Sequence, residues 1–418
     1  MRGFSGGVHP LSKGVTTKVN SAGIPDIAVI PLLQHIGAPC DPVVTVGDHV
    51  LAGQLVGESK AAFSAKIHAS VSGKVTHLEK RPCPGGTDSM CIVIEHDGKD
   101  QWIKASPRRN PAKSDIVNII RDAGIVGMGG AMFPTHIKLN PKKPVDTVIL
   151  NCAECEPHIS ADHRLLLENP DEVVKGLKLV AGAVKARSAL IGIEDNKQDA
   201  VAGLSRSGGD VKVLATRYPQ GAEKMLIRAL VRREVPPNGL PMDVGVIVVN
   251  AATAYAIYEA AYTGIPLVRR IVTVAGSAVK KPQNLLVRIG TPFRMLAKHA
   301  GLCCEPAKII MGGPMMGLSQ HTDEIPVIKG TNGALFLRKE DVPDEEKLTC
   351  IRCGRCVDAC PMRLVPSKIG TYSEKGMAEE CRELNATDCI ECGACSYACP
   401  SKIPLVQLIK NAKVMIKC

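Results

Sequence analysis

CIRCGRCVDACP (residues 350–361) and CIECGACSYACP (residues 389–400) are two copies of one pattern, C-x2-C-x2-C-x3-C-P. This spacing binds [4Fe–4S] clusters, because three closely spaced thiolates bind one cube and the fourth, before proline, binds the other. Paired structural zinc sites are the alternative, but zinc has no use for the C-P tail in both copies. We therefore expect two clusters and single-electron transfer. The expected ligands are Cys350, Cys353, Cys356 and Cys399 for one cluster, and Cys389, Cys392, Cys395 and Cys360 for the other.

The size and composition of the chain fit a protein of several domains. Its 418 residues suggest three or four domains, and only 3% of them are aromatic, so the cores must rest on aliphatic side chains. No stretch approaches the roughly 18 uninterrupted apolar residues of a membrane-spanning helix. The first seven residues hold no apolar run, so we expect no signal peptide. Cluster thiolates need a reducing compartment, which predicts a cytoplasmic protein whose nine other cysteines are free thiols.

The net charge of +11 is concentrated in the middle of the chain. Residues 113–339 hold 29 Lys and Arg against 20 Asp and Glu, whereas residues 340–418 hold 11 against 12. A basic middle suits phosphate-bearing cofactors or an acidic partner. Nucleic acid is the rival interpretation, but the low aromatic content and the absence of a basic block from the sequence argue against it.

The N-terminal region alternates apolar and polar residues between glycine turns, at 43–50, 53–56 and 67–75. That pattern predicts a small flattened β-barrel. The string VGDHVLAGQ (residues 46–54) resembles biotinyl and lipoyl carrier domains, which share a barrel-sandwich fold. A carrier needs an exposed lysine at a hairpin tip, and Lys60 lies too soon after Gln54. We therefore expect a structural barrel without a swinging arm.

Strands and helices alternate after a polar linker at residues 101–113. Ser114 is expected to cap a helix that stops at Gly124. Strands are predicted at 145–150, 189–193, 211–215 and 244–249, and helices at 171–184, 198–205, 222–231 and 252–261. This order predicts a buried, mainly parallel sheet. Short strands with Gly-Pro turns follow at 271–335, and an acidic hinge at 340–346 leads to the cysteine module.

A glycine-rich loop, GIVGMGGAMFPTHIK (residues 124–138), lies between the first helix and the first strand. It is not a Rossmann fingerprint, because no strand precedes it and no helix opens directly on it. The glycines could simply form a tight loop. However, Gly129 and Gly130 would let backbone amides approach a phosphate or a flavin closely, Phe133 offers a stacking face, and Lys138 offers a cation. We expect a cofactor loop.

Polar residues follow two of the predicted strands, where an α/β sheet binds its ligands. Asn151, Glu154 and Glu156 come after the first strand, and the two carboxylates suit ribose hydroxyls or a nicotinamide amide. Asn250 and Thr253 repeat the arrangement at a helix N-terminus, which can hold phosphate. The alternative for Glu154 and Glu156 is that they cap backbone amides. Cys152 and Cys155 could form a redox dithiol, but two buried thiols are the simpler interpretation.

These strings together resemble the RnfC family, which supplies one of the subunits of Rnf ferredoxin:NAD+ oxidoreductases. The resemblance rests on GIVGMGGAMFPTHIKL, NCAECEP, YPQGAEK (residues 218–224), VNAATAYAIYEA, the N-terminal GFSGGVHP and both cysteine runs. The middle is also similar to the flavin subunit of respiratory complex I, which binds FMN on the glycine-rich loop and NADH beside it. The resemblance implies FMN contacts at Gly127, Gly129, Gly130, Lys138, Asn151, Asn250 and Thr253. It implies NADH contacts at Phe133, Glu156 and Glu223, with Glu154 and Gly221 in the same cofactor site.

The implied architecture is an α/β multidomain chain. It comprises a barrel-sandwich hybrid at residues 1–106, a Rossmann-like FMN/NADH domain at 112–265, an SLBB β-grasp domain at 266–338 and an α-helical 2[4Fe–4S] ferredoxin-like domain at 340–418. A flavin is also required chemically, since hydride transfer moves two electrons and each cluster accepts one. A carboxylate in the nucleotide crevice repels a 2′-phosphate, so NADH is expected over NADPH.

The resemblance implies an NAD-facing subunit of an Rnf complex, which couples oxidation of reduced ferredoxin by NAD+ to Na+ or H+ translocation. The implied partners are the other Rnf subunits, including a ferredoxin-like Fe–S subunit and integral membrane subunits, with ferredoxin reached indirectly. The implied location is peripheral, on the cytoplasmic side of the cell membrane, and no nucleic acid is expected to bind. Two alternatives stay open: a soluble flavin and Fe–S reductase, such as the similar cobalamin reductase, and a flavin-free wiring or docking subunit.

Overall fold

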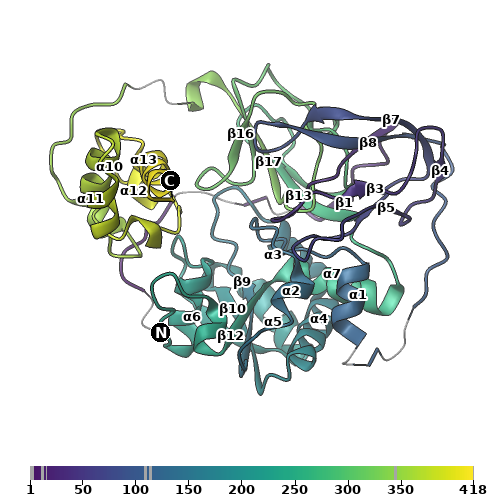
Figure 1. Ribbon diagram of the computed structural model, residues 1–418, viewed down its shortest axis with the longest axis horizontal. Coiled ribbons are helices and arrows are strands. Elements are labelled where there is room, and N and C mark those ends of the chain that lie inside the picture. Colours follow the sequence, from purple (N-terminus) through teal and green to yellow (C-terminus); the bar gives the residue numbers. More distant parts are fainter. Residues whose placement is uncertain are drawn as a thin grey trace.

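The computed structural model describes residues 4–10, 14–15, 17–107, 111–112, 115–342 and 346–417. Arg108, Arg109 and Ser114, which were expected in the linker and at a helix N-cap, lie outside these residues. Figure 1 shows a helix-flanked parallel sheet at the bottom, two bodies of strands above it, and a small helical module to one side. Among the described residues, no helix has both the length and the apolarity to cross a membrane.

The N-terminal body is a barrel of two small antiparallel sheets, ordered β2-β8-β7-β4 and β3-β5-β6. Apolar side chains from both sheets meet in one core, including Val50, Val56, Ile67 and Ile94. The predicted flattened barrel is therefore confirmed. Its strands are β2 (Ile27–Pro31), β3 (Asp41–Pro42), β4 (His49–Val50), β5 (Leu55–Glu58), β6 (Ile67–His68), β7 (Gly73–Pro82) and β8 (Asp88–His96).

The central body holds a four-stranded, fully parallel sheet in the order β11-β10-β9-β12. The predicted strands are confirmed within about two residues, the usual uncertainty at element ends. The chain runs outward from β9 through β10 to β11 and then returns to place β12 on the other side of β9. The strand order thus reverses between β9 and β12. The strands are β9 (Thr147–Cys152), β10 (Ser188–Glu194), β11 (Asp210–Leu214) and β12 (Val246–Asn250).

Seven helices of the central body accompany this sheet in the described ranges (Figure 1). The four predicted helices are observed as α4 to α7, and the helix before Gly124 as α1; α2 and α3 were not predicted. A buried aliphatic layer joins the sheet to the helices, with Val148 and Leu150 packing beside Leu177 and Ile257. The helices are α1 (Ile116–Asp122), α2 (Thr135–Lys138), α3 (Ala161–Glu168), α4 (Pro170–Ala183), α5 (Gln198–Arg206), α6 (Glu223–Val231) and α7 (Ala251–Thr263).

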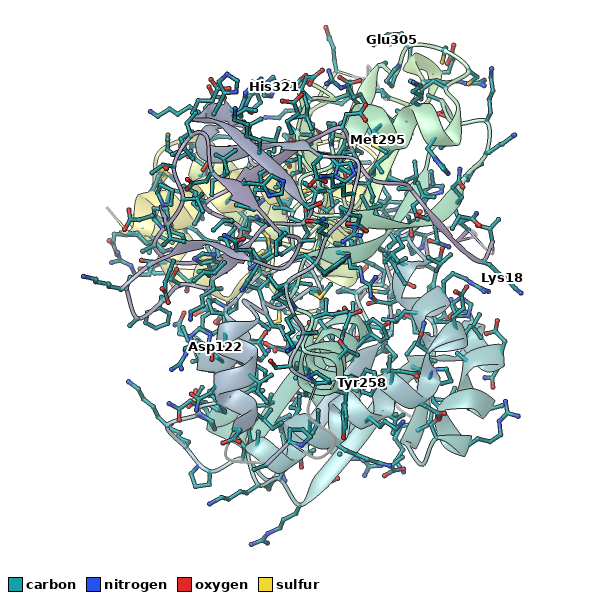
Figure 2. The ribbon with its side chains drawn as sticks, turned by 90° about the vertical axis from the view of Figure 1, so that its right-hand side faces the viewer. Lys18, Asp122, Tyr258, Met295, Glu305 and His321 are labelled. Carbon is teal, nitrogen blue, oxygen red and sulfur yellow. The ribbon has the colours of Figure 1, made fainter. Side chains whose placement is uncertain are left out.

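The third body is a six-stranded mixed sheet, ordered β1-β14-β13-β17-β15-β16, with one helix packed on it. Its edge strand β1 comes from the N-terminal region, where the sequence analysis expected the barrel domain, and it pairs parallel with β14. Seen from the side, Met295, Glu305 and His321 of this body lie above Asp122 and Tyr258 of the central body (Figure 2). Its elements are β1 (Val19–Ser21), β13 (Arg269–Ala275), β14 (Gln283–Arg288), α8 (Phe293–Ala300), β15 (Lys308–Met311), β16 (Leu318–Gln320) and β17 (Gly333–Leu337).

The cysteine module is a small α-helical body, as predicted. Its core gathers the aliphatic residues Ile369, Leu405 and Ile409 with several cysteines, among them the fully buried Cys381. Its helices are α9 (Arg355–Ala359), α10 (Pro366–Glu374), α11 (Ala378–Glu383), α12 (Ala394–Tyr397) and α13 (Leu405–Lys417). Short 3-10 turns are η2 (Asp195–Lys197), η3 (Pro241–Val244), η4 (Lys339–Asp341) and η5 (Ala386–Asp388).

The N-terminal strap, residues 4–8, ties the cysteine module to the central body. The Gly7 amide donates to the Ala359 carbonyl at 2.8 Å, while Val8 and Tyr218 exchange backbone hydrogen bonds at 2.9 Å. Gly6 adopts φ +79°, and a Cβ there would lie 2.6 Å from the Cys360 carbonyl oxygen. Only glycine fits this close approach. The strap therefore lies between the cysteine module and the strand-end edge of the parallel sheet.

Candidate functional site

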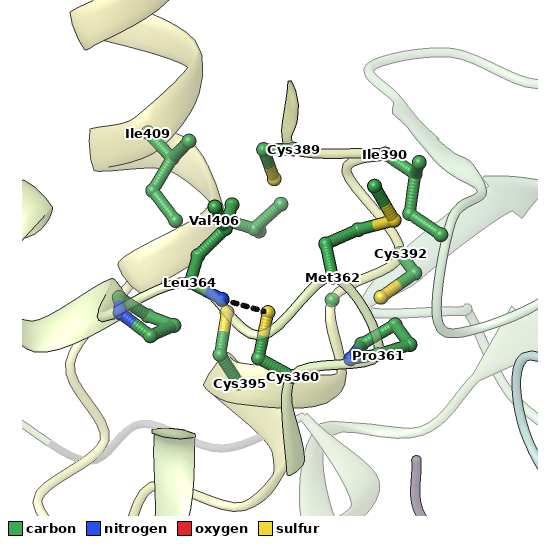
Figure 3. Close-up of a pocket in the computed structure, with 12 residues that line it drawn as sticks. Cys360, Pro361, Met362, Leu364, Cys389, Ile390, Cys392, Cys395, Val406 and Ile409 are labelled. Atoms are coloured by element: carbon green, nitrogen blue, oxygen red, sulfur yellow. Dashed lines mark hydrogen bonds between the residues drawn. The ribbon is translucent and has the colours of Figure 1, made fainter. Parts of the chain in front are cut away.

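Four cysteine thiols surround one pocket in the helical module. Figure 3 shows Cys360, Cys389, Cys392 and Cys395 lining it together with apolar residues such as Met362. Three of the thiols come from the second cysteine run and the fourth from the first, which is the set expected for one cluster. The Leu364 amide donates to Cys360 Sγ at 3.4 Å, and the Glu391 amide to Cys389 Sγ at 3.3 Å. Amides that donate to sulfur suit cluster thiolates.

The donor chemistry of this pocket fits an iron–sulfur cluster. Burial raises the pKa of Cys392 to about 11 and that of Cys395 to about 12, and the neighbouring thiols add to both effects. Four such groups can be thiolates together only beside strong positive charge, which bound iron supplies. Within the described ranges, no three His, Cys, Asp or Glu side chains are close enough to share a single metal ion.

The other four cysteines form a more open set. Cys350 and Cys353 are exposed, Cys399 is half-buried and Cys356 is buried. The run Leu348–Arg355 is exposed throughout, and Leu348 and Ile351 are among the most exposed large apolar side chains of the chain. The two expected ligand sets therefore differ in environment: one lines an enclosed pocket, and the other belongs to a surface loop.

The glycine-rich loop is a tight hairpin that the rest of the protein holds in place. The Gly127 amide donates to the Phe133 carbonyl at 2.9 Å, and the Met132 amide to the Gly127 carbonyl at 3.1 Å. The Met128 amide donates to the buried Thr253 hydroxyl at 2.9 Å. Gly130 is exposed with φ +105°, and no described atom lies within 4 Å of a Cβ built on it. The loop thus presents open backbone to an approaching group, and Thr253 anchors it.

Asn151 and Asn250 are cross-strand partners at the carboxyl ends of β9 and β12. The strand order reverses between these two strands, and such a point is where an open α/β sheet binds its ligands. Asn250 accepts from the Ala252 and Thr253 amides and so caps α7. Asn151 donates to the Gly221 carbonyl at 2.8 Å. A Cβ on Gly129 would lie 3.4 Å from that of Asn250, so the loop and the crevice adjoin.

Glu154 is a helix cap in this structure. Its two carboxylate oxygens accept from the Asp162 and His163 amides at 2.7 and 2.9 Å, at the start of α3. Burial and the neighbouring Asp162 raise its pKa to about 8. Buried Lys197, which donates to the Ala153 carbonyl at 2.6 Å, lies close by. The structure therefore favours amide capping over the expected cofactor contact, because both oxygens already have partners.

Glu156 is likewise occupied, by a loop of the six-stranded body. Its carboxylate accepts from the Met315 and Met316 amides at 3.0 and 2.8 Å. Burial raises its pKa to about 7, while these amides and Tyr218 favour the charged form. A Cβ on Gly313 would lie 2.2 Å from Glu156 Oε2, so the loop fits closely over the carboxylate. Here too the structure favours amide capping over the expected NADH contact.

Lys138 and Glu223 form an ion pair with each other across the mouth of the crevice. The first was expected to contact FMN and the second NADH, so the structure brings these two residues together. Glu223 begins α6, and both side chains are partly exposed. Gly221, two residues earlier, donates its amide to Cys155 Sγ at 3.4 Å and leaves little space for a side chain.

Tyr218 was not singled out from the sequence, although it opens the string YPQGAEK. It is buried, and its hydroxyl donates to the Cys392 carbonyl at 2.6 Å. It also pairs with Glu156. Its apolar neighbours join the two bodies: Ala359, Cys392 and Ala394 of the helical module, together with Cys155 of the central body. One side chain therefore connects the strand-end edge of the sheet to the loop of the four-thiol pocket.

Comparison with family models divides the chain into four matching regions. They are the RnfC barrel sandwich hybrid domain (residues 2–99), the Nuo51 FMN-binding domain (120–259), the SLBB domain (271–319) and the 4Fe–4S dicluster domain (349–403). The expected fold class is therefore confirmed. The FMN-binding region contains the glycine-rich loop and both strand ends, and the dicluster region contains all eight cysteines of the two runs.

Whole-chain relatives agree with these regions. The chain is 49% identical to the RnfC-type subunit of the proton-translocating ferredoxin:NAD+ oxidoreductase complex of Clostridium ljungdahlii, covering 99% of this chain and 94% of the relative. It is 47% identical to the Na+-translocating counterpart of Acetobacterium woodii, covering 98% and 96%. It is 40% identical to the corresponding subunit of the ion-translocating oxidoreductase complex of Rhodobacter capsulatus, covering 98% and 82%.

A solved structure shares the fold at low identity. A chain of an NAD+-reducing [NiFe]-hydrogenase superposes with a TM-score of 0.51 and 18% sequence identity, covering 73% of this chain and 63% of that chain. This match supports the arrangement of the bodies and nothing about chemistry.

Proposed function

Because the chain belongs to the RnfC family of ion-translocating ferredoxin:NAD+ oxidoreductase complexes, we propose that it passes electrons between NAD(H), FMN and two [4Fe–4S] clusters. One observation carries this proposal. Tyr218, at the strand-end edge of the flavin domain, hydrogen-bonds the loop of the four-thiol pocket, so the flavin crevice and one cluster pocket share a boundary.

The residues of the crevice fit an FMN. The exposed backbone of Gly129 and Gly130 would lie against the flavin, while Asn151, Asn250 and the amides of α7 define the strand-end side. Lys138 would offer its ammonium to the phosphate in place of its ion pair with Glu223. When bound, FMN supplies the exchange between one two-electron hydride step and two one-electron steps. Thr253 acts on this site indirectly, by fixing the Met128 amide.

The two clusters would serve different ends of the path. Cys360, Cys389, Cys392 and Cys395 line the pocket beside Tyr218 and would bind the flavin-facing cluster. Cys350, Cys353, Cys356 and Cys399 would bind the outer cluster, whose loop is exposed and carries Arg352 and Arg355. Exposed cations around a cluster favour an acidic electron-transfer partner. The order proposed is NAD(H), flavin, inner cluster, outer cluster, partner.

The partners would be the other subunits of the complex. A ferredoxin-like Fe–S subunit would exchange electrons with the outer cluster, integral membrane subunits would couple this transfer to Na+ or H+ movement, and ferredoxin would be reached indirectly. We place the chain at the cytoplasmic side of the membrane, where NADH is available. Glu223 and Phe133 remain the proposed NADH contacts, and a carboxylate there favours NADH over NADPH.

Cofactor content and nucleotide response would test this proposal. Protein purified anaerobically should contain about eight irons per chain, as two cubes require, and one non-covalent FMN that NADH bleaches. A flavin-free wiring subunit would contain iron without flavin. A soluble reductase of the cobalamin type would contain both but would not co-purify with membrane subunits. Two zinc ions without iron would overturn the electron-transfer assignment altogether.

A further inference from the structure

The N-terminal barrel contributes an exposed aromatic ring beside the glycine-rich loop. Phe63 is 51% exposed, although the following Ser64 and Ala65 are buried. Its ring lies edge-on to that of Phe133, with centroids 6.2 Å apart and an interplanar angle of 67°. Phe133 is half-buried and belongs to the loop itself. Two of the five phenylalanines in the chain thus meet at this one place, from two different domains.

The backbone around Phe63 is fixed. The Ala38 amide donates to the Phe63 carbonyl at 2.9 Å, and the Ser64 hydroxyl lies 3.1 Å from His35 Nε2. Gly37 adopts φ +128°, and a Cβ there would lie 2.0 Å from the Phe63 carbonyl oxygen, so only glycine fits. The exposed ring therefore stands on an ordered segment, and little entropy is lost when a ligand contacts it.

The barrel is also fixed to the loop. The Ile36 amide donates to the Met132 carbonyl at 3.1 Å. Buried Lys329 donates from Nζ to the Lys66 carbonyl of the barrel at 2.6 Å and to the Gly124 carbonyl at 2.7 Å. These bonds come from both sides of Phe63 in the barrel sequence. They hold its ring at a set position relative to Phe133.

We propose that Phe63 and Phe133 form a two-domain aromatic clamp that stacks on a planar ring of the nicotinamide dinucleotide. The inference rests on the proposed function. The flavin belongs on the other side of the loop, where Gly129 faces Asn250 at the strand ends. The clamp lies on the open side, which suits a substrate that enters and leaves. Stacking on exposed aromatic faces is a general way of holding nucleotide bases.

Phe63→Ala is the direct test, carried out on the oxidised, flavin-loaded, iron-loaded protein. Equilibrium binding of NAD+ by calorimetry should weaken roughly 5- to 100-fold, the range for loss of one base–aromatic stack. Flavin reduction followed against NADH concentration in stopped flow should need correspondingly more NADH, with an unchanged limiting rate. Flavin and iron contents should equal those of the wild type. Phe63→Trp should restore binding, because it restores an aromatic face.

Two variants separate stacking from simple hydrophobic contact and from changes to the barrel. Phe63→Leu keeps an apolar side chain without a π face, and it should bind NAD+ as weakly as Phe63→Ala. Val46→Ala removes another exposed apolar side chain of the barrel, 58% exposed, and should leave NAD+ binding unchanged. Full binding in Phe63→Leu would show that stacking plays no part, and would overturn the clamp.

The outcomes distinguish this inference from the function on which it rests. If the wild-type protein neither binds NAD+ nor is bleached by NADH, the proposed function itself fails. If the wild type does both and Phe63→Ala is unchanged, only the clamp fails. If Phe63→Ala loses FMN while its remaining holoprotein binds NAD+ normally, Phe63 supports the flavin loop and the clamp is contradicted.

Discussion

The hydroxyl of Tyr218 donates a 2.6 Å hydrogen bond to the backbone carbonyl of Cys392. One residue belongs to the flavin domain and the other to the cysteine module, and both are buried. This contact, together with the strap at residues 4–8, fixes the four-thiol pocket at the edge of the parallel sheet. The shortest route between the crevice and a cluster therefore passes beside a single tyrosine.

Removing that hydroxyl should weaken the junction without removing a cluster ligand. Tyr218→Phe leaves the Cys392 carbonyl without this donor, and an unsatisfied buried group costs about 1–3 kcal/mol. Thermal unfolding should show the loss, while iron content stays at the wild-type value. Tyr397→Phe is a matched control, since Tyr397 is 54% exposed in the same module and should change nothing. Equal stability of the two variants would mean that the hydrogen bond is not formed.

Cysteine substitutions should separate the two clusters. Cys392→Ala should lose the inner cluster and Cys353→Ala the outer one, each leaving about four of the eight irons if the other cube persists. Cys381→Ser should keep all the iron. Cys381 is fully buried in the aliphatic core, so the serine should instead lower the melting temperature. Iron analysis and EPR distinguish these variants, and iron loss in Cys381→Ser would redraw the ligand sets.

Valine at Gly130 should expel the flavin. The backbone there has φ +105°, which a β-branched residue rarely adopts, and the new side chain would project from the exposed face of the loop. FMN content should fall while both clusters remain. Gly85→Val is the control, because Gly85 has φ +113° with no described atom within 4 Å, in the hairpin between β7 and β8. Full FMN occupancy in Gly130→Val would mean that the loop is only a turn.

Glu156→Gln should act on stability rather than on nucleotide binding. The glutamine keeps one acceptor oxygen for the two amides, and an amide left unpaired costs about 1–3 kcal/mol. Because the pKa of Glu156 is raised to about 7, its contribution to wild-type stability is complete below the unfolded pKa and is lost as pH rises through 7. Melting temperatures from about pH 6 to pH 8 should therefore fall more in the wild type than in Glu156→Gln. A changed NADH dependence instead would restore the nucleotide role.

An exposed thiol pair on the six-stranded body should react unequally. Arg338 Nη2 lies 2.9 Å from Cys303 Sγ and lowers the pKa of that thiol, while the adjacent Cys304 has its pKa raised by burial and by Cys303, with Glu340 adding a smaller increase. Cys303 should thus remain a thiolate to lower pH and alkylate faster than Cys304. Peptide mapping after timed iodoacetamide treatment measures both. Arg338→Gln should move the pH profile of Cys303 upward; an unmoved profile would exclude the guanidinium as its cause.

The cysteine ligand sets and the parallel sheet follow from local sequence. Spacing within each run brings three thiols together, and the C-P tail carries Cys360 to the other run. Apolar runs at 145–150 and 244–249 likewise predict β9 and β12 directly, since strand formation depends on neighbouring residues. The carboxylates do not follow in this way. Glu156 meets the amides of Met315 and Met316, 159 and 160 positions away, and no local pattern announces such partners.

The same distinction separates the N-terminal strands from the barrel they precede. β1 pairs with β14, so Val19 lies opposite Asn284. Three short residues carry no signal of a partner on another domain. Phe63 is similar: nothing in its own neighbourhood indicates Phe133, and only the docking of the barrel on the loop brings the two rings together. Contacts between domains were therefore the part of the site that the sequence did not predict.

Oxidation of the pre-reduced protein by NAD+ tests the central claim most directly. The wild type and the flavin-depleted Gly130→Val variant are reduced photochemically without oxygen, mixed with NAD+, and followed by cluster absorbance and by NADH formed. The wild type should form NADH as its clusters are reoxidised, whereas the flavin-depleted variant should keep its clusters reduced. Equal reoxidation of both proteins by NAD+, or clusters in the wild type that NAD+ cannot reoxidise, would contradict a path from NAD(H) through the flavin to the clusters.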